Sequence, residues 1–116
     1  MVVFRKQYLF LPILAFILFS CTDKHADSII TKAEQLLNTK PDSALAVLDD
    51  IRESKEDWPR SQQMRYELVY AQAQNKAYVN FTTDSIVLSL VDYYEHHGNA
   101  NEQMMANYMA GCAYRD

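Results

Sequence analysis

The side chains best able to bind a metal ion lie in one short segment, where His96 and His97 follow Glu95. His25 is the only other histidine among the 116 residues. Adjacent residues of a helix point about 100° apart, so this set makes a poor chelate. A histidine near the C-terminal end of a helix is also stabilised by the helix dipole alone. We therefore predict that the chain binds no metal.

Three carboxylates, Asp49, Asp50 and Glu53, are close enough in sequence to suggest a general acid and base. They alternate with apolar residues at helical spacing, which indicates the solvated face of a helix. The sequence has no glycine-rich phosphate loop, nucleophile elbow or HExxH motif. We predict a protein that is not an enzyme and has no cofactor.

The two cysteines, Cys21 and Cys112, are too few for a disulfide framework in a small exported domain. Cys112 lies in a segment of helical pattern, and we interpret it as a small buried apolar residue. Cys21 stands just after an apolar run and Ser20, and this position suggests a role other than disulfide formation.

The first 20 residues have the pattern of a secretory signal. Arg5 and Lys6 precede 12 mostly apolar residues, Tyr8 to Phe19, and the small residue Ser20 follows. A membrane-spanning helix needs roughly 20 apolar residues, so this run is too short for a permanent span. We predict that residues 1–20 are a signal peptide.

The segment Leu18-Phe19-Ser20-Cys21 resembles a bacterial lipobox. The resemblance implies a diacylglycerol on the Cys21 sulfur, cleavage before Cys21, and a fatty acid such as palmitate on the new amino terminus. Several acyl chains hold a protein stably to a bilayer. Two alternatives are an ordinary cysteine after conventional cleavage and an uncleaved anchor. The polar residues Thr22 to His25 directly after Cys21 favour the lipoprotein.

The residue after the lipidated cysteine bears on the destination membrane. Aspartate there is the familiar signal for retention in the inner membrane, and this chain has Thr22 instead. Acidic residues shortly after the cysteine can mark surface export in some lineages, but Asp23 and Asp27 are too sparse to decide it. We expect a protein of the cell envelope, in the outer membrane rather than the inner, on its periplasmic or its surface face.

The chain without residues 1–20 has 96 residues, enough for one small domain. Removing Arg5 and Lys6 leaves 9 basic against 15 acidic side chains and a formal charge of -6. An acidic surface repels phosphate backbones, which argues against nucleic acid as a direct partner. Apolar residues recur along the whole segment, which excludes a disordered chain.

The mature chain is predicted to be all-α, because its apolar residues fall at i, i+3, i+4 and i+7 and no segment alternates with period two. Residues 21–27 are expected to form the lipidated cysteine and a short polar tether, with Asp27 or Ser28 as the first N-cap. Gly98 fits the left-handed position that ends helices. The expected helices are 28–38, 41–54, 59–78, 84–97 and 100–116.

Residues 108–114, Tyr-Met-Ala-Gly-Cys-Ala-Tyr, resemble the first helix of a tetratricopeptide repeat. Ala110-Gly111 matches the apolar-glycine pair of that helix, and Tyr114 matches its tyrosine. Glycine inside a helix costs about 1 kcal/mol relative to alanine, so we expect Gly111 to allow a second helix to pack closely.

Residues 41–48 resemble the second helix of such a repeat, with Ala44 at the small position and Leu48 at the larger apolar one. Leu68 is the equivalent of Ala110, 42 residues earlier, against about 34 in the standard unit. Residues 28–116 thus resemble the lipid-anchored tetratricopeptide-repeat proteins of Gram-negative bacteria. The resemblance implies antiparallel helical hairpins stacked as a short right-handed α-solenoid.

The resemblance also implies a function, because stacked helical hairpins form a concave surface that binds peptides or proteins. We expect a membrane-tethered interaction scaffold, which some larger proteins carry as the exported part of a signalling or regulatory protein. The alternative is an outer-membrane lipoprotein that assists the uptake of nutrients or glycans.

The last predicted helix would expose an apolar surface, because no second helix follows it in these 116 residues. We expect either that the native protein continues beyond Asp116 or that another chain covers this surface. The residues concerned are Met104, Met105, Tyr108, Met109, Cys112 and Tyr114.

Overall fold

The computed structural model describes residues 21–116, and this part of the chain is helical without any strand. The order of the elements is α2 (Lys24–Leu36), α3 (Pro41–Ile51), the 3₁₀ helix η1 (Arg52–Asp57), α4 (Arg60–Lys76), α5 (Ser85–His97) and α6 (Ala100–Arg115). The prediction of a compact all-α domain is confirmed.

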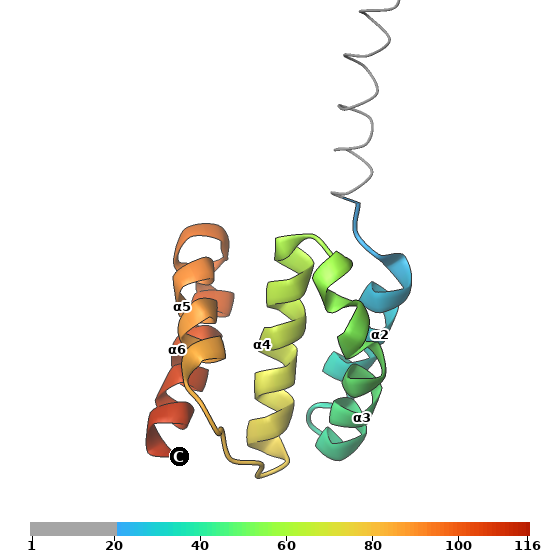
Figure 1. The fold of residues 1–116 in the computed structure, drawn as a ribbon. Coiled ribbons are helices and arrows are strands. Elements are labelled where there is room, and N and C mark those ends of the chain that lie inside the picture. Colours follow the sequence, from blue (N-terminus) through green and yellow to red (C-terminus); the bar gives the residue numbers. More distant parts are fainter. Residues whose placement is uncertain (1–20) are drawn as a thin grey trace, which may run out of the picture.

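The long helices run alternately up and down (Figure 1). Each packs against its neighbour in sequence, and α4 also packs against both α2 and α6. The start of α2, the start of α4 and the α5–α6 connection lie at one end of the domain (Figure 1). The turn between α2 and α3, the connection after α4 and the end of α6 lie at the other.

Helix α4 is the centre of the fold, because its two sides belong to two different hydrophobic clusters. The first cluster joins it to α2, α3 and Trp58, and the second joins it to α5 and α6. The buried apolar residues of α4 divide accordingly into Tyr66, Val69 and Ala73 on the first side and Met64, Leu68 and Ala71 on the second.

Tyr66 ties α3 to α4 inside the first cluster. Its side chain is fully buried, and its hydroxyl donates a hydrogen bond of 2.8 Å to the carbonyl oxygen of Leu48. Burial raises the pKa of the Tyr66 phenol to about 12. The Tyr66 ring also contacts Trp58 edge to face, with 5.4 Å between the ring centroids. The hydrogen bond to Leu48 matters because a buried hydroxyl without a hydrogen-bond partner would destabilise the core.

Helix α2 begins earlier than predicted. Asp23 has an extended backbone and caps the helix, accepting a hydrogen bond of 3.1 Å from the Ala26 amide through its side chain. Asp23 is as good a cap by residue type as Asp27 or Ser28. Residues 24–27, predicted to be a tether, are therefore the first turn of the helix.

The two glycines of the chain have different surroundings from those predicted. Gly98 has φ -100° and ψ 167°, which is an extended rather than a left-handed conformation. A methyl group there would lie 2.6 Å from Cδ1 of the buried Tyr94, so close approach explains this glycine. At the exposed Gly111 a methyl group would meet no atom of the described residues within 4 Å.

The two glycines predict opposite effects of the same substitution. Gly98→Ala should lower the free energy of unfolding by about 1–3 kcal/mol, because the new methyl group collides with Tyr94. Gly111→Ala should raise it by up to about 1 kcal/mol, because alanine favours the helix and has room. Urea unfolding of both variants measures these effects. A loss of stability in Gly111→Ala would show that something packs on that face.

Candidate functional site

A groove runs along one face of α4, between α2 on one side and α6 on the other. It consists of two hollows of about 300 and 470 Å³, and Leu37 lines both. The α4 residues on its floor recur three or four positions apart, so they form a single stripe. From Arg65 to Lys76 this stripe spans about 16 Å at 1.5 Å per residue.

The smaller hollow contains apolar carbons beside charged and amide groups. Leu68, Val69 and Gln72 of α4 form its floor. The walls come from α2, α5 and α6, through Glu34, Leu37, Tyr94, Asn101, Glu102 and Met105. A mixture of apolar surface and a few polar groups is typical of binding sites for organic ligands.

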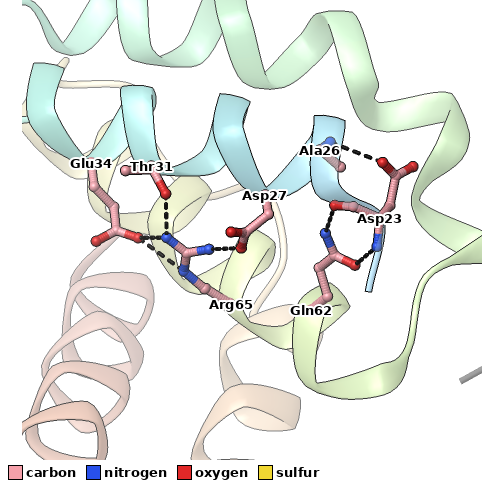
Figure 2. A network of polar contacts seen from close by, with 7 residues as sticks. All are labelled: Asp23, Ala26, Asp27, Thr31, Glu34, Gln62 and Arg65. Atoms are coloured by element: carbon pink, nitrogen blue, oxygen red, sulfur yellow. Dashed lines mark hydrogen bonds and ion pairs between the residues drawn. The ribbon is translucent and has the colours of Figure 1, made fainter. Parts of the chain in front are cut away.

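Arg65 fixes the distance between α2 and α4 at this hollow (Figure 2). Its guanidinium donates hydrogen bonds of 3.0 Å to the Thr31 hydroxyl and of 2.5 and 3.0 Å to the Glu34 carboxylate. It also forms an ion pair with Asp27. One side chain of α4 thus contacts three successive turns of α2. The groove therefore keeps a defined width on this side.

The larger hollow lies at the other end of the groove, where the α2–α3 turn, the end of α4 and the end of α6 meet. Its lining includes the side-chain amides of Asn38, Asn75 and Asn80, together with Lys76 and Arg115. Each amide offers both a donor and an acceptor, as a peptide bond does. The Arg115 guanidinium donates to the Asn75 side-chain oxygen over 3.4 Å.

Tyr78 is an unusual residue at the rim of this hollow. Its backbone has φ 60°, the only positive φ among the described residues, and its side chain is 94% exposed. The left-handed conformation costs a side-chain-bearing residue roughly 1 kcal/mol, and glycine is the usual occupant after a helix. Such strain is often found where a residue serves a ligand. The conformation ends α4 two residues before the predicted Tyr78.

The residues predicted to pack in the repeats fall into three groups. Ala44 and Leu48 are fully buried in the first cluster, and Leu68 and Ala110 are buried in the second. Leu68 also lines the groove. Gly111 is exposed, and Tyr114 is 70% exposed, so within residues 21–116 no second helix packs on that face of α6.

The other sequence candidates lie apart from the groove. Asp49, Asp50 and Glu53 are exposed, as predicted for a solvated face. Cys112 is 5% exposed and is a buried core residue, as predicted. Cys21 is exposed and lies three residues before α2. The predicted signal peptide, residues 1–20, lies outside the described residues.

His96 and His97 make different contacts at the end of α5. The His96 ring nitrogen Nδ1 lies 3.0 Å from the Asp92 carbonyl oxygen, and this hydrogen bond raises the His96 pKa. His97 instead stacks on Tyr93, with 4.5 Å between ring centroids. Asp92, Glu95 and His96 bring one ligand atom each within 4.8 Å of the others, but all three are exposed. Sequence inspection missed Asp92, although its i−4 spacing from His96 is a readable signal.

A third hollow of about 200 Å³ lies outside the groove, beside Arg52, Glu67 and Tyr70. Glu67 is 3% exposed and forms an ion pair with Lys55. The Arg52 guanidinium lies 4.8 Å from the centroid of the Tyr70 ring. The ion pair compensates the buried charge of Glu67, and we interpret both contacts as support for the packing of η1 on α4.

Comparison with known proteins adds no relative: the chain matches no protein-family model, and neither a curated protein nor a solved structure matches it significantly. No helix in residues 21–116 has both the length and the apolarity that a bilayer crossing requires.

The ion pairs of Arg65 with α2 should stabilise the fold by an amount that depends on the salt concentration. Arg65→Met keeps an apolar stem but removes the links to α2, so the free energy of unfolding should fall by about 1 kcal/mol at low salt. The loss should shrink in 1 M NaCl, because the partly exposed pairs are screened there. Chemical denaturation at both salt concentrations measures this effect.

Lys32→Met is the matched control, since Lys32 is an exposed cation of α2 that forms no ion pair with the described residues. It should change the stability little at either salt concentration. Equal losses in the two variants would mean that the Arg65 contacts do not hold α2 on α4.

Proposed function

We propose that this protein is a membrane-tethered scaffold that binds a segment of a partner protein in the groove along α4. The observation that carries the proposal is the continuity of the groove. Two hollows share Leu37 and follow one stripe of α4 between α2 and α6. The role proposed for the groove is binding and not catalysis, and its lining offers amides, charged groups and apolar carbons to a ligand.

The proposed architecture is a short right-handed solenoid of tetratricopeptide type, with hairpins α2–α3 and α4–α5 and with α6 as the first helix of a third. The contacts support it, because the first helices of successive hairpins, α2 with α4 and α4 with α6, pack side by side. The long connection between Lys76 and Ser85 accounts for the enlarged repeat spacing.

The groove favours an extended segment as its ligand. A stripe of about 16 Å matches roughly five residues of extended chain at 3.3 Å each. An extended segment leaves its backbone amides unpaired, and the side-chain amides of Gln72, Asn75 and Asn101 supply donors and acceptors for them. The exposed side chains of Tyr78, Val79 and Tyr108 at the larger hollow offer apolar surface that suits an aliphatic or aromatic side chain.

Tyr78 permits a test that separates binding from stability. Tyr78→Gly should raise the free energy of unfolding by about 1 kcal/mol, because glycine adopts the left-handed conformation without strain. It should also weaken peptide binding about 10-fold, the equivalent of about 1.4 kcal/mol, through the loss of an exposed aromatic contact. Peptides selected from a random phage-displayed library on the mature protein provide the probe, and fluorescence anisotropy measures their affinity.

The control for this experiment is Tyr114→Ala, which removes another exposed tyrosine that lies outside both hollows. The affinity of the selected peptides should not change in this variant. Equal weakening in both variants, or no weakening in Tyr78→Gly, would place the peptide elsewhere and reject the groove.

The tether is proposed to be lipid on Cys21, in the outer membrane. Cys21→Ala should abolish the incorporation of a labelled fatty acid and should release the protein from the membrane fraction, because alanine has no sulfur to carry the lipid that would hold the protein to the bilayer. Metabolic labelling followed by fractionation measures both effects. Labelling that persists in the variant would rule out Cys21 as the lipidation site.

A further inference from the structure

The polypeptide between the proposed lipid and the folded domain is only one residue long. Helix α2 is capped by Asp23, so Thr22 alone separates Cys21 from the ordered domain. Three successive Cα atoms span at most about 7 Å. A lipid on Cys21 would therefore hold Asp23 within about 7 Å of the acylated residue.

Asp23 itself is fixed to α4 by a reciprocal pair of hydrogen bonds (Figure 2). Its backbone amide donates to Oε1 of Gln62 over 3.0 Å, and Nε2 of Gln62 donates to the Asp23 carbonyl oxygen over 2.8 Å. Gln62 is 4% exposed, so these bonds are partly buried. The residue that caps α2 is thus hydrogen-bonded directly to the central helix, two positions after Cys21.

The position of Asp23 defines one end of the domain. The start of α2, the start of α4 and the α5–α6 connection share that end (Figure 1). The hollow beside Tyr78 lies at the opposite end, and along α4 the distance from Gln62 to Lys76 is about 21 Å at 1.5 Å per residue. A short attachment at one end therefore places the two ends at different heights above a bilayer.

We propose that the domain stands end-on against the lipid headgroups, with the Asp23 end in contact and the Tyr78 hollow facing away from the membrane. The inference rests on the proposed lipid anchor. The contacting end exposes both signs of charge, including Lys24, Arg60, Asp57 and Glu56. Its partner is therefore a zwitterionic headgroup surface, and the short attachment rather than electrostatic attraction sets the orientation.

The orientation can be measured with two exposed serines, each in the first turn of a helix, at opposite ends of the domain. Ser61 is the second residue of α4, beside Gln62, and Ser43 is the third residue of α3, at the other end. Ser61→Cys and Ser43→Cys would be made separately in the acylated protein purified from membranes. A fluorophore on the new thiol is selective, because lipid occupies the Cys21 sulfur and Cys112 is buried.

The labelled proteins would be added to phosphatidylcholine vesicles that contain a lipid with a nitroxide on its headgroup. The Ser61→Cys label should be quenched several-fold more strongly than the Ser43→Cys label. A flexible Gly/Ser insert of about 16 residues after Thr22, which spans roughly 20–24 Å, should remove most of this contrast. The insert leaves the Asp23–Gln62 bonds in place, so it tests the length of the attachment alone.

Mass spectrometry of the same samples separates the two claims. An acylated Cys21 with selective quenching supports both the anchor and the orientation. An acylated Cys21 with equal quenching of the two labels, or with a contrast that survives the insert, overturns the end-on orientation and leaves the anchor standing. A Cys21 without acyl groups overturns both.

Discussion

The fold depends on the burial of α4 on two sides. Tyr66 and Leu68 are two positions apart, and they belong to different hydrophobic clusters. A helix buried on both sides has only narrow strips left for polar residues, and one of these strips is the groove floor with Gln72 and Lys76. The groove exists because α2 and α6 both pack on α4 without covering this strip. The contacts of Arg65 with Thr31 and Glu34 then hold α2 beside α4 at the edge of the groove.

The sequence was sufficient to predict the helices, because helix-forming periodicity is local. Their ends were harder to predict where a distant residue decides between equivalent caps. Asp23 and Asp27 are both good caps, and the choice follows from Gln62, which is 39 positions away from Asp23 in the chain. Gly98 was predicted to be a turn glycine on its residue type, whereas its actual constraint is the ring of Tyr94. Such contacts exist only after the helices have packed.

The candidate site was less accessible to sequence reasoning than the fold. Leu68 was identified as a packing residue, and its second role in the groove follows from the place of α6 on α4. Tyr78 carries no sequence signal at all, since a tyrosine in the left-handed region contradicts its own preference. Asn38 lies in the α2–α3 turn and Asn75 in α4, and only the tertiary fold brings them to one hollow.

The location of the single tryptophan gives this protein a natural optical reporter. Trp58 is 4% exposed, packs on Tyr66 and belongs only to the cluster formed with α2 and α3. Its fluorescence therefore follows the melting of that half, while circular dichroism follows every helix. Because α4 is shared, the two signals should change together if the halves unfold as one cooperative unit. A difference between them would identify the α5–α6 half as a separate unit of local unfolding.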